Sequence, residues 1–225
     1  MARCLDEGGD AMTGLWLLQG LMGLGLFLVI QAVRQGGRLP GRSSAISWVL
    51  LGGCLLVPRI PVGGLSLAQW VAGFSPGCSI PLLAVAAHAA IRALGGPPLF
   101  RPQELQSLWI LGVVLGVVLY PASLGWGTWD PYAEGWGRSW IFLVLGVVAA
   151  VFLLLGVRSG YVLLAAILAW RLGALESTNY WDYLVDPQFF LIALICLAMG
   201  AFARARANPA AAAGSEAKKP LNAVG

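Results

Sequence analysis

Apolar residues along this chain are gathered into long stretches separated by short polar segments. Ser139 to Val157 is almost wholly apolar. At 1.5 Å per residue, such a stretch reaches across the ~30 Å hydrocarbon core of a bilayer. The stretches of this kind cover residues 13–33, 44–58, 79–94, 106–123, 139–157, 160–175 and 188–203. The pattern predicts an all-α membrane protein with about seven transmembrane helices, or six if one of the shorter stretches does not cross.

The segments outside these stretches set the predicted organisation. Residues 1–12 are expected to be a short extracytoplasmic N-terminus, and residues 13–206 the transmembrane helical domain. Residues 207–225 are rich in alanine and polar residues, so we expect a disordered cytoplasmic tail. Residues 61–78 are apolar but broken by glycine and proline. That segment fits a surface helix, a re-entrant loop or the start of the third span.

Composition supports the membrane class. Hydrophobic residues make up 59% of the chain and charged residues 11%, whereas soluble domains carry about 25% charged residues. The net charge of +4 does not indicate nucleic-acid binding, because the basic residues are scattered singly without a dense patch beside aromatic residues. The lipid bilayer is the expected partner.

The distribution of arginine and lysine predicts the orientation. With the N-terminus outside, the inner segments hold ten basic residues and the outer segments four. The inner set is Arg34, Arg38, Arg42, Arg92, Arg101, Arg158, Arg204, Arg206, Lys218 and Lys219, and the outer set is Arg3, Arg59, Arg138 and Arg171. Cytoplasmic loops carry the excess of basic residues, so the N-terminus is predicted outside and the C-terminus inside.

Common catalytic and cofactor patterns do not occur in the sequence. The four cysteines form no C-x-x-C pair, and there is no phosphate-binding glycine loop. Ser79 precedes the single histidine, His88, by nine positions, which on one helix is about 13.5 Å and too far for a nucleophile–base pair. We therefore expect no cofactor, no metal and no catalytic residue.

Aromatic and acidic residues concentrate in two loops on the predicted outer face, residues 124–140 and 176–187. Together these loops hold five tryptophans, three tyrosines and five carboxylates. One interpretation is an aromatic belt that anchors helix ends at the headgroup level. The other is a binding surface, because aromatic faces beside carboxylates suit sugar rings and cationic headgroups. The candidate binding residues are Trp126, Trp129, Asp130, Tyr132, Glu134, Trp136, Tyr180, Trp181 and Asp182. If they form one site, the two loops must touch.

Two further groups of polar residues have separate expected roles. Asp186 precedes Pro187, so it should cap the last helix from outside it, which leaves Asp182 as the better functional candidate. His88 lies within the third apolar stretch, where a structural hydrogen bond is favoured over a proton-transfer role. Arg171, near the outer end of the sixth stretch, is expected to extend to the interface, with Glu176 or Asp130 as alternative partners.

The segment from Asn179 to Pro187, with Tyr120-Pro121 and residues 129–132 upstream, resembles a group of small uncharacterised bacterial inner-membrane proteins that carry a W-D-Y-L-x-D-P segment. The resemblance covers residues 61–203. It implies a multi-pass protein of the bacterial inner membrane and implies no activity.

Three functions fit this sequence. The leading hypothesis is a non-catalytic accessory or scaffold subunit whose outer loops contact another membrane subunit or an envelope glycan or lipid. The alternative is an enzyme acting on a lipid-linked envelope substrate, with the loop carboxylates as candidate acids and bases. A transporter component is the third, supported by the broken segment 61–78 and opposed by the scarcity of charge within the spans.

Overall fold

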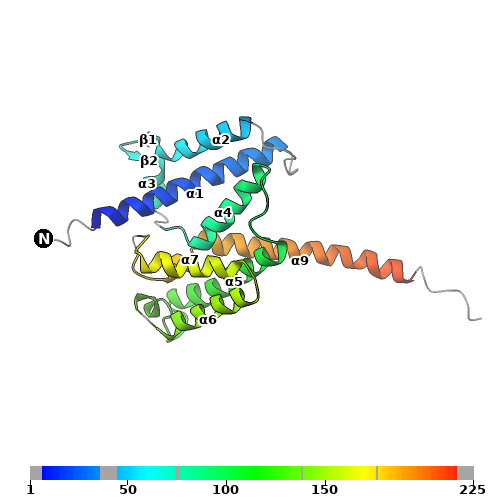
Figure 1. Ribbon diagram of the computed structural model, residues 1–225. Helices are drawn as coiled ribbons and strands as arrows, with labels where there is room; N and C mark the ends of the chain where they lie inside the picture. The colour runs from blue at the N-terminus through cyan, green and yellow to red at the C-terminus, as the bar shows by residue number, and fades with distance from the viewer. Residues whose placement is uncertain (1–6, 36–44, 74–76, 138, 176, 217–225) are drawn as a thin grey trace, which may run out of the picture.

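A computed structural model describes residues 7–35, 45–73, 77–137, 139–175 and 177–216. Long helices account for most of these residues (Figure 1). They are α1 (Glu7–Gln35), α2 (Ala45–Leu56), α4 (Ile80–Ala93), α5 (Pro102–Ser123), α6 (Trp140–Leu154), α7 (Ser159–Arg171) and α9 (Pro187–Glu216). One long helix coincides with each predicted apolar stretch, so the all-α prediction is confirmed.

Short elements fill the connections. They are the 3-10 turns η2 (Val57–Arg59) and η3 (Ala133–Trp136), the strands β1 (Pro61–Val62) and β2 (Leu65–Ser66), and the helices α3 (Leu67–Ala72) and α8 (Trp181–Leu184). The glycine- and proline-broken segment from residue 61 therefore begins as a two-stranded antiparallel hairpin and continues as a single short helix. The three predicted alternatives, a surface helix, a re-entrant loop or the start of the third span, differ in their position relative to a membrane and stay predictions.

Two of the helices are long and apolar enough to cross a membrane, within the part of the chain that the structure describes. They are Pro102–Ser123 and Pro187–Arg206. The apolar helices Leu15–Gln31, Ala45–Arg59, Ile80–Ala93, Trp140–Leu154 and Ser159–Arg171 are shorter. Length and composition thus identify two spans, where the sequence pattern predicts seven.

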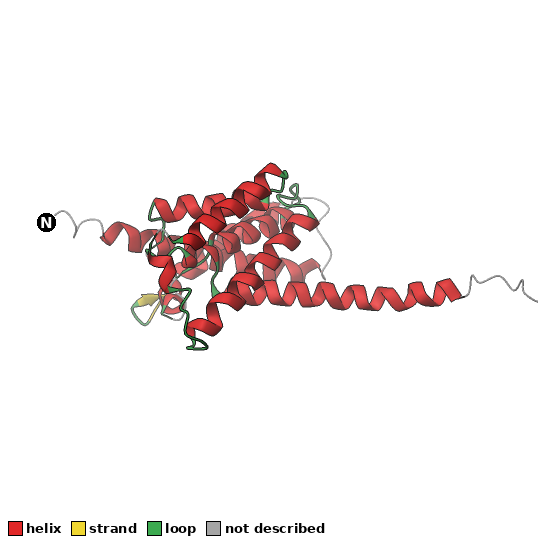
Figure 2. Ribbon diagram, turned by 90° about the horizontal axis from the view of Figure 1, so that it is seen from below, coloured by secondary structure: helices red, strands yellow, loops and turns green. Residues whose placement is uncertain are grey.

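The last helix extends further than expected. α9 continues to Glu216 and projects beyond the other helices in both views (Figures 1 and 2). Residues 207–216 are thus helical, which differs from the predicted disordered tail. Alanine has the highest helix propensity, and this segment contains a run of four alanines. The remainder of the predicted tail lies outside the described residues.

Helix packing divides the molecule into two hydrophobic clusters. The larger one joins α4, α5, α6, α7, α8 and α9, and the smaller one joins α1 and α2 to the end of α4. α5 and α9 approach closely because Gly112 and Gly116 face the rings of Phe189 and Phe190. A side chain at either glycine would overlap these rings, so the glycine pair permits the close packing of the two helices.

A buried carboxylate joins the N-termini of α4 and α9. Asp186 is 6% exposed, and its Oδ1 accepts a 2.6 Å hydrogen bond from the backbone N–H of Phe189 in the first turn of α9. Its Oδ2 accepts a 2.5 Å bond from the N–H of Ser79, the residue that caps α4. The predicted capping of α9 by Asp186 is confirmed. Asp186 also binds the N-cap residue of a second helix, α4. Each helix N-terminus carries a partial positive charge that stabilises the anion.

Glu104 plays the corresponding part at the opposite end of the helices. It is 4% exposed, and its Oε2 accepts a 2.6 Å bond from the N–H of Arg101, the N-cap residue of α5. Its Oε1 accepts a 3.1 Å bond from the N–H of Arg158, the N-cap residue of α7. The hydroxyls of Ser107 and Ser159, 2.7 Å apart, strengthen the same junction. Each buried carboxylate thus fastens a pair of helices.

Two substitutions at Asp186 test whether its carboxylate stabilises the N-termini of α4 and α9. Asp186→Ala leaves two backbone N–H donors without a carboxylate, so we expect a loss of about 1–4 kcal/mol of stability. Asp186→Asn keeps one acceptor oxygen and should lose less. The measurement is thermal unfolding in detergent, with Asp130→Ala, an exposed aspartate that caps only a loop turn, as the control. Equal effects of the two alanine variants would contradict the two-helix role of Asp186.

Candidate functional site

The two aromatic loops pack against each other at one end of the helices. We call residues 124–137 and 177–186 together the loop cap. The backbone N–H of Tyr180 donates to the carbonyl of Gly135 at 3.1 Å, and the indole Nε1 of Trp181 donates to the carbonyl of Pro131 at 2.7 Å. The predicted contact between the loops is therefore confirmed.

Asn179 holds the centre of the loop cap. Its Nδ2 donates to the carbonyl of Tyr132 at 2.9 Å, while its Oδ1 accepts from the N–H of Trp181 at 3.0 Å. The side chain is fully buried. Gly135 lies directly against it, and a Cβ at that position would overlap the amide of Asn179 and the indole of Trp181. Sequence reasoning missed Asn179, because only its contact with a residue 47 positions away makes it important.

Two of the candidate binding residues are core residues. Tyr180 and Trp181 are 2% and 1% exposed. The Tyr180 ring packs edge-on against Trp170 and Phe142, at centroid distances of 6.0 and 6.1 Å. Nearby, the indole of Trp170 donates to the carbonyl of Thr178 at 2.8 Å. These rings support the cap from beneath and do not form a surface that a ligand contacts.

Tyr183 closes the second loop. Its hydroxyl accepts from the N–H of Leu175 at 3.0 Å and lies 3.0 Å from the carbonyl of Ser177. The ring is fully buried. This residue, like Asn179, was not among the sequence candidates, because its importance depends on contacts that only the folded loop brings together.

Tyr132 and Asp182 form a pair across the two loops. The phenol of Tyr132 donates to Oδ2 of Asp182 at 3.1 Å, and both side chains are partly buried. Burial, together with the charge and hydrogen bond of Asp182, raises the pKa of Tyr132 to about 12. The phenol therefore remains a hydrogen-bond donor at neutral pH, and the pair is a stable contact.

The other two loop carboxylates have different positions. Oδ1 of Asp130 accepts from the N–H groups of Tyr132 and Ala133 at 2.9 and 3.3 Å, which makes Asp130 the stabilising residue of its own turn. Glu134 is partly exposed. Burial is the main cause that raises the pKa of the Tyr180 phenol, and the charge of Glu134 adds to it. Asp130 thus stabilises a turn of its own loop, and Glu134 retains access to solvent.

The tryptophans of the first loop are the exposed part of the cap. Trp126, Trp129 and Trp136 are 74%, 48% and 59% exposed. Trp129 stacks on Trp140 at a centroid distance of 6.4 Å, and Trp136 stands edge-on to Tyr132 at 6.1 Å. Each of these two indoles thus contacts one neighbouring ring while much of its area stays open.

The two remaining candidates are not part of the loop cap. His88 accepts a 3.2 Å hydrogen bond at Nδ1 from the N–H of Phe100, so the expected structural hydrogen bond is confirmed, with a loop as partner. Arg171 is exposed at the end of α7. Its alternative partner Glu176 lies outside the described residues. Ser79 caps α4 and is not paired with His88.

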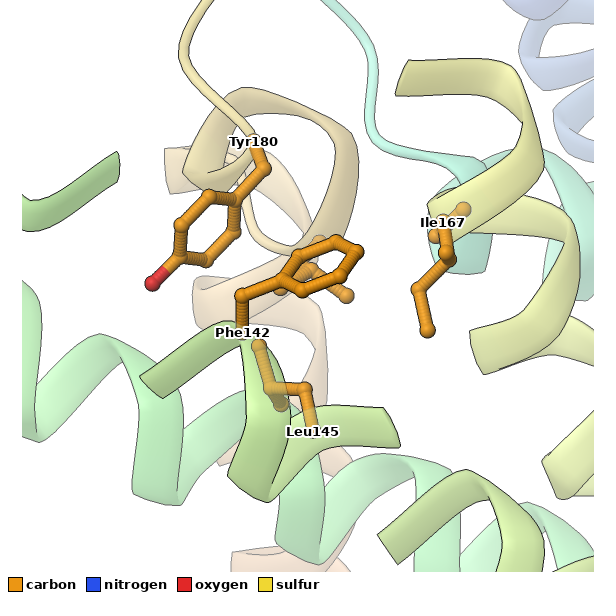
Figure 3. Close-up of a pocket in the computed structure, with 6 residues that line it drawn as sticks. Phe142, Leu145, Ile167 and Tyr180 are labelled. Atoms are coloured by element: carbon orange, nitrogen blue, oxygen red, sulfur yellow. The ribbon is translucent and has the colours of Figure 1, made fainter. Parts of the chain in front are cut away.

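A small hollow lies beneath the second loop, between α6 and α7 (Figure 3). Its volume is about 190 Å³, including the part open to solvent, below the roughly 300 Å³ at which ligand pockets begin. The lining residues are Phe142, Leu145, Ala166, Ile167, Tyr180 and Leu184. In the described ranges, no three His, Cys, Asp or Glu side chains come together as metal ligands. The hollow is therefore a packing defect between apolar side chains.

Comparison with known proteins gives no match to a protein-family model, to a curated protein or to a solved structure. Inference about function therefore depends on the geometry of this chain.

A pair of glycine variants tests the junction of the loop cap. In Gly135→Ala the new methyl group overlaps Asn179 and Trp181, whereas a Cβ at Gly137 meets no atom within 4 Å. We expect Gly135→Ala to lower the unfolding temperature and increase the solvent exposure of the Trp181 indole, and Gly137→Ala to do neither. Thermal unfolding and quenching of tryptophan fluorescence measure both effects. Two variants that behave alike would show that the loops are not in close contact.

Proposed function

We propose that this chain is a multi-pass protein of the bacterial inner membrane with about seven spans. The observation that supports it is how much of its apolar helices faces outward. Only 28% of the most apolar window of α5 and 11% of that of α9 are buried. Core helices of soluble proteins are apolar because they are buried, and these two are apolar without being buried. Neither lies near the N-terminus, where a signal sequence would be.

The shorter helices share this property. α2 exposes Ile46 and Val49, α6 exposes Leu143 and Val147, and α7 exposes Leu168, all at 52% or more. Exposed apolar surface that continues over several helices marks a membrane or protein contact. At about 18–23 Å, helices of 12 to 15 residues are shorter than the ~30 Å hydrocarbon core, so the proposed crossings require a bilayer that is locally thinner.

Charge supports the proposed orientation, with the N-terminus outside. Among the described arginines, six lie at the Glu104 end of the helices or just beyond it, and two lie at the loop-cap end. The six are Arg34, Arg92, Arg101, Arg158, Arg204 and Arg206, and the two are Arg59 and Arg171. The positive-inside rule then assigns the Glu104 end to the cytoplasm and the loop cap to the outer side.

Cysteine labelling tests the orientation. Cysteines introduced at Gly137 and Thr178, both exposed in the loop cap, should react with a membrane-impermeant thiol reagent in intact spheroplasts. A cysteine at Pro97, exposed in the connection between α4 and α5, should react only after lysis. The wild-type chain measures the background from its own cysteines. Labelling of Pro97→Cys in intact cells would reverse the proposed orientation.

Within that membrane setting, we propose a non-catalytic scaffold or accessory role in which the loop cap contacts a second membrane subunit. The observation that favours it is the division of roles in the cap. Asp130 and Asp186 are bound to backbone N–H groups, and Tyr180 and Trp181 are buried. The side chains that remain available for contact with a partner include the exposed indoles of Trp126, Trp129 and Trp136. Tryptophans held rigidly at a surface are the side chains most enriched in protein-contact hot spots.

An enzyme acting on a lipid-linked envelope substrate is the second candidate. It is favoured by the Tyr132–Asp182 pair, because Asp182 is a partly exposed loop carboxylate bound to a side chain and not to a backbone turn. An acid–base role would need a second carboxylate at a defined distance, and partly exposed Glu134 is the candidate.

Photocrosslinking tests the scaffold role. A photoreactive residue in place of Trp126 should give a protein adduct of discrete mass in native membranes. Trp129→Ala combined with Trp136→Ala should abolish this adduct without reducing the amount of protein in the membrane. Trp48→Ala, which changes an exposed tryptophan on α2, is the matched control and should leave the adduct unchanged. Adducts with lipid alone would favour the aromatic belt, and retention of the protein adduct in the double variant would contradict the scaffold role.

A further inference from the structure

Three arginines lie at the connection between α4 and α5, at the Glu104 end: one in the last turn of α4, one at the N-cap of α5, and one that contacts the connection from the start of α7. The N–H of Phe100 is bonded to His88, and Arg92 stands one helical turn after His88 on the same face of α4. Arg101 follows Phe100 directly. Arg158 reaches this connection from α7, since its Nη1 donates to the carbonyl of Leu99 at 2.7 Å. We call Arg92, Arg101 and Arg158 the arginine cluster.

The nearest acid leaves the cluster with positive charge. Glu104 is buried, and both of its carboxylate oxygens accept backbone N–H bonds, from Arg101 and Arg158. Neither Arg92 nor Arg101 forms a side-chain hydrogen bond or ion pair with another residue in the described ranges. Arg101 and Arg158 are exposed, and Arg92 is partly exposed. Three guanidinium groups against one carboxylate leave this surface with a net charge of about +2 at neutral pH.

Apolar side chains continue outward from the cluster. Leu99, whose carbonyl accepts from Arg158, is 37% exposed, while Leu154 and Leu155, at the end of α6 just before Arg158, are 87% and 70% exposed. The exposed face of α6 carries this apolar surface along the helix through Val151 and Val147. The cationic cluster matches the phosphate headgroup of a phospholipid, and the apolar strip on α6 matches its acyl chains.

We propose that the arginine cluster binds the phosphate of an anionic phospholipid whose acyl chains lie against α6. The guanidinium fork matches phosphate oxygens, and Arg158 is already held in place by the carbonyl of Leu99. A zwitterionic lipid brings its own cation and binds the cluster less well. This inference rests on the proposed membrane location. It adds a specific lipid-binding site to the general attraction between basic residues and anionic lipids.

The proposal predicts selective lipid retention. In protein purified in detergent, native mass spectrometry should show retention of phosphatidylglycerol over phosphatidylcholine of the same acyl chains. Arg101→Gln and Arg92→Gln should each weaken that retention about fivefold, as expected for one basic residue near an anionic surface. Arg101→Lys should keep part of it. Higher ionic strength should reduce it, because the charges are exposed.

Arg171→Gln is the matched control, because Arg171 is exposed at the other end of the helix that follows Arg158. It should leave retention unchanged. If Arg171→Gln weakened lipid retention as much as the cluster variants do, the lipid would be attracted by the overall charge, and the proposed site would be wrong. Equal retention of the two lipids by the wild-type protein would also overturn the site. Soluble glycerol phosphate forms a second arm. If glycerol phosphate displaced the lipid at an equal concentration, the cluster would be a site for free phosphate and not for a lipid.

The experiment separates this proposal from the membrane proposal on which it rests. Fractionation of cells shows whether the chain remains with the membrane, independently of Arg92 and Arg101. A chain that leaves the membrane after mild salt washing contradicts the proposed location. A chain that stays there without lipid preference contradicts only the lipid site.

Discussion

Burial of two carboxylates, each shared between two helix N-termini, is the constraint on which the rest of the structure depends. A helix leaves its first N–H groups without partners inside the helix, and burial of such groups without an acceptor is costly. Asp186 accepts from α4 and α9, and Glu104 accepts from α5 and α7. Because each carboxylate is bonded on both oxygens, its charge is stabilised by backbone N–H groups and by helix dipoles. At Glu104 the positive charges of Arg158 and Arg101 add to this stabilisation. Apolar contact alone has no such direction, and in a bilayer it barely distinguishes helix neighbours from lipid. These two residues therefore specify which helices start side by side.

The loop cap depends on the same arrangement. Asp186 ends the segment that follows α8, so fixing its position on Ser79 also fixes the buried residues just before it. Trp181 can then reach the carbonyl of Pro131, and Asn179 the carbonyl of Tyr132. A chain segment held by buried side chains at several points has few alternative conformations. The cap is consequently suited to present the exposed tryptophans as a fixed surface.

The sequence predicted local features well and long-range pairings poorly. Apolar stretches located every long helix, and the proline after Asp186 identified that residue as a cap. The second partner of Asp186 is 107 residues away, and the pairing of Glu104 with the N–H of Arg158 spans 54 residues. No periodicity encodes either contact. Tyr180 and Trp181 looked like surface aromatics because they adjoin polar residues in a loop, and only the fold shows that they face inward. The alanine-rich segment after residue 206 was classed by its low complexity, although its helix propensity favoured the helix that forms.

The way the chain uses its few acids bears on function. It has ten aspartates and glutamates, and those at positions 104, 130, 182 and 186 already accept hydrogen bonds from the protein itself. A carboxylate that holds backbone N–H groups cannot take up or release a proton without weakening the fold, which makes it a poor general acid or base. Two of the arginines show the opposite pattern, since Arg92 and Arg101 form no side-chain hydrogen bond within the described residues, whereas Arg158 donates to the carbonyl of Leu99. Hydrogen-bonded acids at these four positions, together with exposed cations and indoles, fit the proposed contacts at the two faces of a membrane, with lipid phosphates on one side and a neighbouring subunit on the other.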